Sequence, residues 1–467
     1  MKKSDPKIKA EKLSDELTRV NPDAAGIDIG SASHFVAVPP GRDEEPVREF
    51  KSFTSDLYAI ANWLKKCGIK TVAMESTGVY WIPLFEILEA HGFEVLLANP
   101  RHLKNVPGRG KSDVIDCQWI QKLHSFGLLS GSFRPEQQIC ELRAYTRQRE
   151  GLVKSISNHI RGMQKAMSLM NIQLHNVLSD ITGETGFRII RAIVAGERCV
   201  KKLAALRDRR CKNSTEVIEK SLEGNYKPEH LFKLRQELAL YDKYQEMLFE
   251  CDEVIKSSLE QFDDKIDINQ NPLTPKENKK RRKNELYFDA REYLYKMSGV
   301  DLTMIDGLDS RSVLKLLGET GLDMSRWPTA SHFSSWLALA PGTKINGGKR
   351  LSGKTKPSAN RAAEIFRVAA FTLSNSHSAL GAFYRRMKTR LGAPKAITAT
   401  AHKIARLFYI MLRFGKDYKD TGATYYEEQY RSRVIKNMQA KAAKLGFYLA
   451  PLAPSDLDNI YSNCEVS

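Results

Sequence analysis

The chain has 467 residues, of which 42% are hydrophobic and 27% charged, a composition typical of a globular protein with several domains. Its 73 Lys and Arg residues outnumber 55 Asp and Glu residues, and the net charge of +18 favours polyanionic partners because each neutralised phosphate releases condensed counterions. No run approaches about 18 apolar residues and the basic N-terminus lacks the apolar core of a signal peptide, so we expect a cytoplasmic protein with no membrane partner.

Strands and helices alternate in the first part of the chain. Five short apolar segments predict strands: AAGIDIG, HFVAVPP, REFKSF, TVAMEST and EVLLANP, and turn residues join the first three as in an antiparallel meander. Helical periodicity marks SDLYAIANWLKKCG, WIPLFEILEAHG and SDVIDCQWIQKLHSFG. The alternation predicts a mixed α/β sheet over roughly residues 23–130.

The rest of the chain is predicted to be mostly helical. LRAYTRQREGLVKSISNHIRGMQKAM and LFKLRQELALYDKYQEMLFECDEVIKSSLEQF space apolar residues three and four apart, as long amphipathic or coiled-coil helices do. NQNPLTPKENKKRRKNE interrupts this pattern and then becomes basic, which indicates a linker. We therefore divide the chain into a basic tail (1–22), an α/β domain (23–135), a helical or coiled-coil region (136–270), a basic linker (271–287), a second, mostly helical domain (288–420), and a basic helix with its tail (421–467).

Two acidic residues stand in apolar strands. Asp28 lies between Gly26 and Gly30, and strand alternation turns it away from the neighbouring isoleucines. A carboxylate in such a strand is costly unless it is paired or binds a metal, and the glycines would leave room for a metal ion or a phosphate. Glu75 repeats the arrangement at the end of the TVAMEST strand. A structural aspartate at a strand end is the alternative explanation of Asp28.

A second pair of acids begins a helix. Asp113 and Asp116 are three residues apart, so they share a helix face, and Ser112 is a good N-cap. Acids in a first turn also favour the helix dipole, which is a purely structural explanation. The set of four, however, is typical of a site for two divalent cations about 3.5–4 Å apart that assist phosphodiester displacement. Oxygen ligands favour Mg²⁺ or Mn²⁺ over zinc.

Basic residues precede the second acid pair. The segment ANPRHLKNVPGRGKSD places cations on a Pro- and Gly-containing loop, where they suit phosphate contacts beside a metal site. These cations are Arg101, Lys104, Arg109 and Lys111. A solvated basic loop without a binding role is the alternative.

Several of these segments resemble one family. GIDIG, MESTGVYW, NPRHLKN and GRGKSDVIDCQWI resemble the DEDD transposases of the insertion-sequence-110 family, and LALAPGTKINGGKRLSGKTKPSANRAAEIFRVAA resembles their second conserved domain. The resemblance implies a bacterial insertion-sequence transposase that cleaves and rejoins DNA through a RuvC-like, ribonuclease-H-like domain. Its catalytic and metal-binding tetrad would be Asp28, Glu75, Asp113 and Asp116. The resemblance also implies element ends and target DNA as partners, a structured guide RNA, and a dimer or tetramer formed through the long helices.

The second domain departs from the family pattern at one position. Relatives normally carry a serine just before a glycine in the loop after Pro341, and this serine is thought to be the nucleophile that attacks the DNA phosphate. Here the position is Asn346, followed by Gly347, and an amide cannot form the phosphoester. Three explanations stay open: Ser352 in the same loop substitutes, the carboxylates and metal-activated groups suffice, or this copy is disabled.

Two further features of this domain favour nucleic-acid binding. Cations surround the loop, where the enclosing glycines would allow close phosphate approach; those next to it are Lys349, Arg350, Lys354 and Lys356. The turn Ile305-Asp306-Gly307-Leu308-Asp309 resembles a helix–hairpin–helix, whose backbone N–H groups contact phosphate without reading bases. A solvated charge run and an ordinary helical hairpin are the respective alternatives.

Three other functions compete with transposition. A stand-alone RuvC-like junction nuclease would share the carboxylates but would not need the long helices or the second domain. A sugar-kinase-like ATPase is suggested by GIDIGSASH, which also resembles a phosphate-binding hairpin, but the required second Asp-x-Gly strand and adenosine loop are missing. A catalytically disabled nucleic-acid-binding scaffold is consistent with Asn346.

Overall fold

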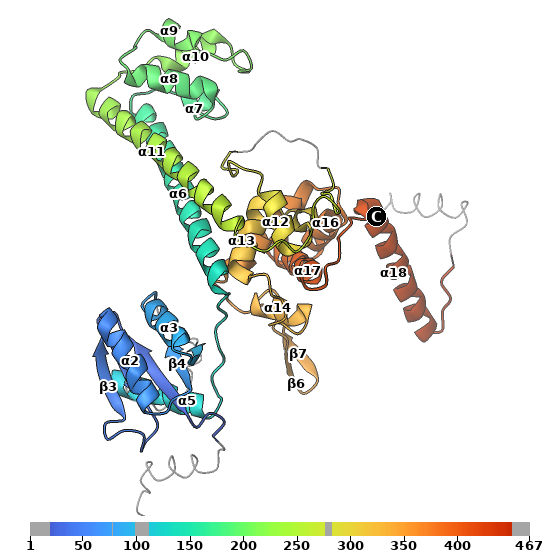
Figure 1. Cartoon of the computed structure of the whole chain (residues 1–467). Coiled ribbons are helices and arrows are strands. Elements are labelled where there is room, and N and C mark those ends of the chain that lie inside the picture. The colour runs from blue at the N-terminus through green and yellow to red at the C-terminus, as the bar shows by residue number, and fades with distance from the viewer. Residues whose placement is uncertain (1–18, 77, 99–111, 276–282, 451–467) are drawn as a thin grey trace, which may run out of the picture. The chain divides into compact units, whose positions relative to one another are not determined.

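The computed structural model describes residues 19–76, 78–98, 112–275 and 283–450. The chain divides into two compact units, Met1–Arg134 and Pro135–Ser467, which are described separately (Figure 1). Among the described helices, none is both long and apolar enough to cross a membrane.

One five-stranded sheet forms the centre of the first unit. Its strands are β1 (Ala24–Ile29), β2 (Ser33–Ala37), β3 (Val47–Lys51), β4 (Thr71–Glu75) and β5 (Glu94–Ala98). The order is β3-β2-β1-β4-β5, in which β1 is antiparallel to β2 and parallel to β4. The predicted meander of the first three strands and the mixed α/β sheet are confirmed, and the arrangement fits the expected ribonuclease-H-like class.

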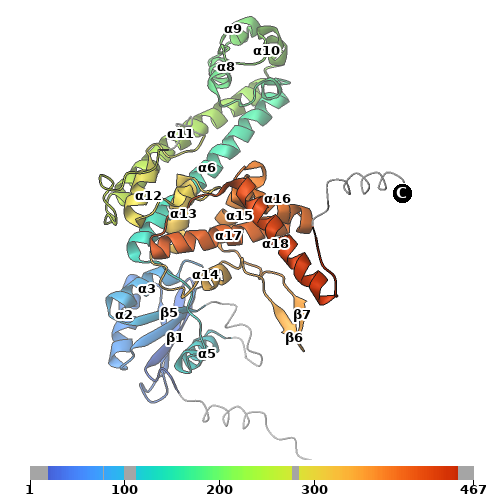
Figure 2. The ribbon, with the colours of Figure 1, turned by 90° about the vertical axis from the view of Figure 1, so that its right-hand side faces the viewer.

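The two faces of this sheet carry side chains of different size. Large side chains such as Ile27, Met74 and Leu97 form the main core with the helices α2 (Thr54–Lys66) and α3 (Trp81–Ala90). The alternate strand positions face the opposite side, where α5 (Asp113–Ser125) packs (Figure 2). That second face is built from small residues, including Ala73 and Ala98, which contact Ile120 and Leu123 of α5.

The closest approach of α5 to the sheet is at Gly26. A Cβ at this position would lie 2.1 Å from the backbone nitrogen of Gln121 and 2.5 Å from the carbonyl oxygen of Cys117. Gly30 has a similar restriction, because its Cβ would lie 2.6 Å from the carbonyl oxygen of Ser33 in the turn between β1 and β2. The protein's own backbone therefore fills the space beside both glycines. The interpretation of these glycines as room for a metal ion or a phosphate is wrong.

Replacing Gly26 by alanine is expected to destabilise the first unit by about 3 kcal/mol, because backbone must move to admit the methyl group. Hydrogen exchange of the full chain should show faster exchange in β1 and α5, and calorimetry a lower unfolding temperature. The control is Gly151→Ala on α6, where a Cβ meets nothing within 4 Å; there we expect a gain of up to about 1 kcal/mol. Equal stability of Gly26→Ala and the unsubstituted chain would contradict the backbone contact.

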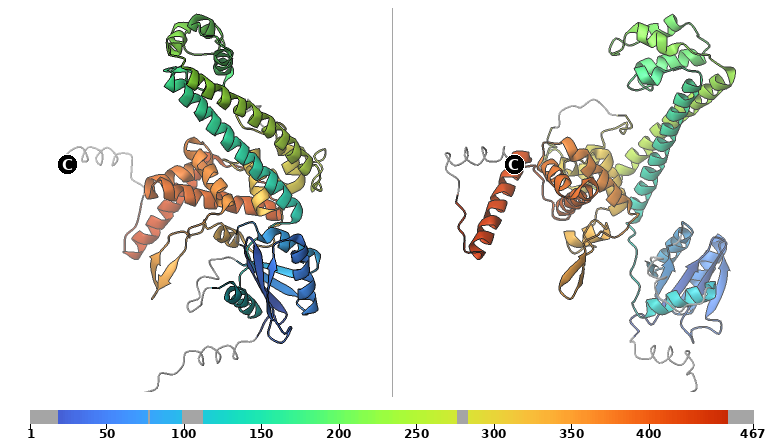
Figure 3. Two further views of the ribbon diagram at one scale, coloured as in Figure 1. Left: turned by 90° about the vertical axis from the view of Figure 1, so that its left-hand side faces the viewer. Right: turned by 180° about the vertical axis from the view of Figure 1, so that it is seen from behind.

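Two long antiparallel helices form one part of the second unit. The helix α6 (Gln137–Leu169) packs along α11 (Pro228–Leu259), and their paired residues run in opposite directions: Arg149 with Asp252, and His159 with Glu237 (Figure 3). Four short helices pack at their far end: α7 (Leu174–Val177), α8 (Glu184–Val194), α9 (Val200–Ala205) and α10 (Thr215–Leu222). The two predicted long helices are confirmed, whereas a coiled coil between subunits stays a prediction.

A mostly helical bundle forms the other part. Its elements are α12 (Ala290–Ser298), η1 (Leu302–Met304), α13 (Ser310–Thr320), α14 (Ala330–Trp336), α15 (Arg361–Thr372), η2 (Leu373–Asn375), α16 (Ala379–Leu391) and α17 (Ala393–Phe414). A strand pair, β6 (Lys344–Asn346) and β7 (Lys349–Ser352), lies between α14 and α15, and α18 (Gly422–Lys444) packs on α16. Buried aromatic rings of Phe333, Phe366, Phe408 and Tyr409 form the centre of the bundle.

The turn that resembles a helix–hairpin–helix lies between η1 and α13. Gly307 has a φ of 89°, and a Cβ there would lie 2.7 Å from the carbonyl oxygen of Ala369 in α15. Contact within the bundle therefore accounts for this glycine. The proposed phosphate contact of the turn stays a prediction.

Candidate functional site

Two of the predicted carboxylates lie on neighbouring strands of the first unit. Ile27 pairs with Met74 in the parallel register of β1 and β4, so the next residue of each strand is Asp28 and Glu75 respectively. Both side chains are partly buried and, by strand alternation, both belong to the face that α5 covers. The end of β4 is fixed beyond Glu75, where the Ser76 hydroxyl donates a hydrogen bond of 3.1 Å to the carbonyl oxygen of Ala98.

Contacts along α5 give its direction across the sheet. In its C-terminal half, Gln121 Nε2 donates to the carbonyl oxygen of Ala24 at the start of β1, and His124 Nε2 lies 2.8 Å from Thr71 Oγ1 at the start of β4. The N-terminal half of α5 therefore lies toward the carboxyl ends of these parallel strands. Asp113 and Asp116 occupy that half, beginning at the N-cap Ser112, whose Oγ accepts from the backbone N–H of Ile115 at 3.3 Å.

Cys117 lies where α5 meets β1, against Gly26. Its side chain is fully buried, and burial raises the pKa of the thiol to about 12, with smaller contributions from the negative charges of Asp28 and Asp116. Asp28 on the sheet and Asp116 on the helix thus act on the same thiol. Asp113 is exposed and lies one turn earlier on the face of Asp116.

The four carboxylates are not grouped into a formed metal site. Among the residues that the structure describes, no three His, Cys, Asp or Glu side chains are arranged to hold a metal ion. The donors nevertheless have the chemistry that Mg²⁺ and Mn²⁺ prefer, since all are carboxylates and three of them are only partly buried. The predicted phosphate-contacting residues Arg101, Lys104, Arg109 and Lys111 lie outside the described residues.

The loop of the second unit that carries Asn346 is a tight β-hairpin. Asn346 ends β6 and Lys349 begins β7, and the two residues between them, Gly347 and Gly348, have φ values of 53° and 75°. Such positive φ values are typical of a two-residue hairpin turn and favour glycine. Asn346 is therefore exposed at the tip of the hairpin.

Ser352 lies at the other end of the same hairpin. It pairs with Lys344, two residues before Asn346, which corresponds to a separation of about 7 Å along the strand. Its Oγ accepts a hydrogen bond of 3.2 Å from the backbone N–H of Lys354. The structure therefore does not bring Ser352 to the position of Asn346.

The basic residues near the hairpin are distributed along its second strand and the segment that follows. Lys349 and Arg350 belong to β7, whereas Lys354 and Lys356 follow it before α15. The side chains of Lys349, Lys354 and Lys356 are exposed to solvent.

Comparison with protein families matches both units. A DEDD transposase model of the IS110 family covers residues 25–172, and a model described as a transposase of the IS116/IS110/IS902 family covers residues 301–385. The chain belongs to the IS110 family of transposases. None of the curated proteins matches it. The first match includes the sheet, α5 and α6 of this transposase, and the second includes the β6–β7 hairpin and α15.

Three residues that position α5 were not among the predicted site residues. Cys117, Gln121 and His124 follow Asp113 at helical spacing, so they lie on the face that carries the carboxylates. That periodicity was the only signal in the sequence, because two of the three contact backbone or a hydroxyl group in strands far away in the chain.

His124 should make the stability of this unit sensitive to acid. The Thr71 hydroxyl donates to the carbonyl oxygen of Glu94, so it accepts from His124 Nε2, and burial lowers the pKa of His124 below its ordinary value of 6.5. The unfolded chain therefore binds a proton more readily than the folded one. The contribution of the neutral His124 side chain to the stability of the folded unit is complete above about pH 6.5. It is lost progressively as the pH falls through the lowered pKa that His124 has in the folded state.

We expect the unfolding temperature of the first unit to fall between about pH 7.5 and about pH 5.5. Calorimetry of His124→Gln should show a smaller fall, although buried His34, whose pKa burial also lowers, retains part of it. Exposed His377 supplies the control, His377→Gln, which should leave the pH dependence unchanged. A His124→Gln profile parallel to that of the unsubstituted chain would refute this role.

Proposed function

We propose that this transposase binds DNA and catalyses metal-dependent cleavage and rejoining of its strands, with Asp28, Glu75, Asp113 and Asp116 as the catalytic carboxylates. The observation that carries the proposal is the arrangement of α5, which brings its acid pair toward the carboxyl ends of the strands that hold Asp28 and Glu75. The carbonyl oxygen of Cys117, the residue after Asp116, lies against Gly26, two residues before Asp28, and this contact supports the same arrangement. All four residues lie within the part of the chain that matches the DEDD transposase model.

We infer that the same carboxylates hold two Mg²⁺ or Mn²⁺ ions. Divalent cations would neutralise charge on the attacking and leaving oxygens of the phosphodiester. The chain's own contribution is to fix the ligands on two rigid elements. The strand register places one pair, and the close backbone packing at Gly26 sets the distance of α5 from the sheet.

Metal binding is testable without measuring transposition. Saturating Mg²⁺ or Mn²⁺ should raise the unfolding temperature of the first unit, since a ligand at about 100 times its Kd stabilises by about 2.7 kcal/mol. Asp28→Asn should lose most of this rise while its metal-free unfolding temperature changes little. Glu44→Gln, an exposed acid of the same unit, is the matched control and should keep the full rise. Equal rises in all three chains would place the metal elsewhere.

DNA, a structured guide RNA and further copies of the chain are the proposed partners. The net charge of +18 favours nucleic acid, and the exposed cations Lys349, Lys354 and Lys356 lie in the matched second domain. Arg350 and the loop residues Arg101, Lys104, Arg109 and Lys111 are proposed phosphate contacts on their sequence alone. Association of copies through the long helices is supported by the exposed apolar residues Phe232, Leu240 and Val254 on α11.

Asn346 raises a second candidate function, a nucleic-acid-binding copy that has lost strand transfer. If relatives use a serine nucleophile at this position, the amide cannot replace it. The hairpin geometry disfavours Ser352 as a substitute, because it lies about 7 Å away along the strand and its hydroxyl accepts a local hydrogen bond.

Excision and integration of a marked element in cells should distinguish these functions. We compare the unsubstituted chain with Asp28→Ala and Asn346→Ser at equal protein levels. Recombination by the unsubstituted chain but not by Asp28→Ala would establish the carboxylate site and make the serine dispensable. Recombination by Asn346→Ser alone would identify a disabled copy that retains its fold. Full activity of Asp28→Ala would overturn the proposed catalytic site.

A further inference from the structure

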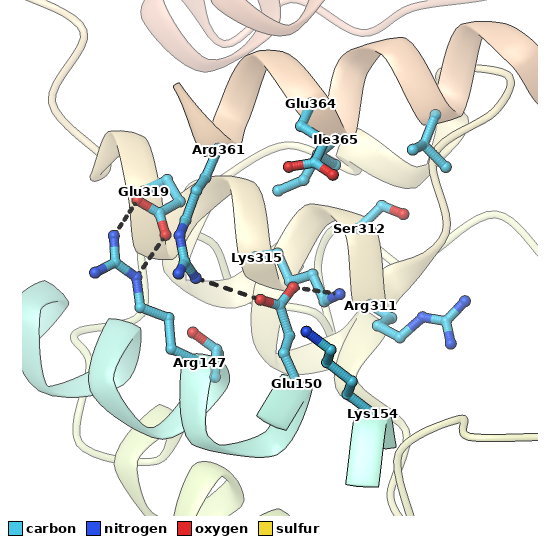
Figure 4. A pocket seen from close by; sticks show the side chains of 12 residues that line it. Arg147, Glu150, Lys154, Arg311, Ser312, Lys315, Glu319, Arg361, Glu364 and Ile365 are labelled. Atoms are coloured by element: carbon cyan, nitrogen blue, oxygen red, sulfur yellow. Dashed lines mark hydrogen bonds and ion pairs between the residues drawn. The ribbon is translucent and has the colours of Figure 1, made fainter. Parts of the chain in front are cut away.

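Three helices of the second unit surround a pocket of about 500 Å³ that neither the carboxylates nor the β6–β7 hairpin uses (Figure 4). The walls of this α6–α13–α15 pocket come from the N-terminal half of α6 and from the helices α13 and α15. Five cationic side chains line it: Arg147, Lys154, Arg311, Lys315 and Arg361. Three glutamates also line it, so the free charge depends on which groups are already paired.

Two of the glutamates are neutralised within the pocket wall. Arg147 donates two hydrogen bonds, of 2.9 and 2.8 Å, to the carboxylate of Glu319. Glu150 forms ion pairs of 2.5 Å with Lys315 and 3.6 Å with Arg361, as the dashed lines in Figure 4 show. These pairs join α6 to α13 and α15 and orient the charged side chains of the wall.

The cations that remain are in excess. Lys154 is exposed and has no ion pair with any described residue, and Arg311 reaches only Asp309, at 3.5 Å. Arg361 keeps about half of its side chain exposed beside its long contact with Glu150. The third glutamate that lines the pocket, Glu364, supplies one negative charge against the positive charges of these three residues. The pocket therefore attracts an anion.

An exposed apolar strip continues from the pocket along α15. Val368 lines the pocket with 59% of its surface exposed, and Phe371, one turn further on, is 61% exposed. A cationic pocket with an exposed aromatic ring on the same helix face has the two features that bind single-stranded nucleic acid, in which bases stack on aromatic rings and phosphates meet the cations. A duplex does not fit this surface, because its base faces are covered by their neighbours.

We propose that the α6–α13–α15 pocket binds a single-stranded DNA segment, with its phosphates at Lys154 and Arg311 and a base against Phe371. The choice of DNA as the strand rests on the proposed function, since cleaved element ends expose unpaired strands. Arg361 also connects the pocket with the exposed cations Lys354 and Lys356, which precede it in the chain.

Fluorescence anisotropy of the full chain with labelled oligothymidylate of about 16 nucleotides tests the proposal. The double charge reversal Lys154→Glu/Arg311→Glu should weaken binding at least tenfold and reduce the slope of log K against log salt by about 1.4, the value for two phosphates. Phe371→Ala, which changes no charge, should weaken binding about fivefold or more. Lys165→Glu, a charge reversal at an exposed lysine of α6 outside the pocket, is the control for each reversal and should change affinity less than twofold.

Further measurements separate a loss of binding at the pocket from unfolding and from a failure of the catalytic proposal. Circular dichroism and unfolding temperature should match between the variants and the unsubstituted chain, because Lys154 and Phe371 are exposed and the partly buried Arg311 has only a 3.5 Å contact with Asp309 among the described residues. Asp28→Ala should bind oligothymidylate normally, so a failure of the catalytic proposal and a failure of this one are distinguishable. Equal weakening by Lys165→Glu, unchanged binding in the charge reversal, or a loss confined to duplex DNA or to oligouridylate would overturn the pocket as a single-stranded DNA site.

Discussion

The first unit depends on the direct contact between the backbone of α5 and the backbone of β1 at Gly26. Packed layers of secondary structure normally stand well apart, about 10 Å for two stacked sheets, because side chains fill the space between them. Here the facing positions are Gly26, Ala73 and Ala98, so the helix comes close enough that even one methyl group at Gly26 would collide with it. Asp28 and Glu75 follow Gly26 and Ala73 by two residues on the same face of the sheet, in the direction of the helix's N-terminal half. The small residues on this face therefore set the distance between the strands that carry Asp28 and Glu75 and the helix that carries Asp113 and Asp116.

The same contact explains why one part of the site is buried while another part is accessible to solvent. Cys117 lies fully buried where α5 meets β1, and the carboxylates that influence it stay partly exposed. Water still reaches a carboxylate at such an edge, while packing fixes its neighbours. This combination suits a metal ligand, because a metal ion can approach a carboxylate that is held in place and is still accessible to solvent.

The strands and helices of the first unit follow from the sequence because local alternation and turn residues encode them, as AAGIDIG and SDLYAIANWLKKCG illustrate. The four acids also stand out, since charge in or beside apolar segments is costly. The role of Gly26 could not be predicted in the same way. A glycine shows that something approaches the backbone, but only the tertiary structure shows that the neighbour is α5. The pocket of the second unit was beyond sequence reasoning too, because Lys154 and Arg311 belong to helices far apart in the chain.

In the second unit, a buried ion pair determines how the long helices meet the bundle. Arg149 and Asp252 are almost completely buried, and the pair is completed by backbone groups: Arg149 donates to the carbonyl oxygen of Asn284, and Asp252 accepts from the N–H of Tyr287. Removing one partner would leave an uncompensated buried charge, at a cost of about 3–5 kcal/mol. The pair therefore fixes the residues before α12 against α6 and α11. Next to Arg149 on α6, Arg147 and Glu150 make partly exposed pairs with α13 and α15, which alone would hold these helices weakly. Because the buried pair already sets the helix positions, the exposed charges beside it are available to meet a ligand.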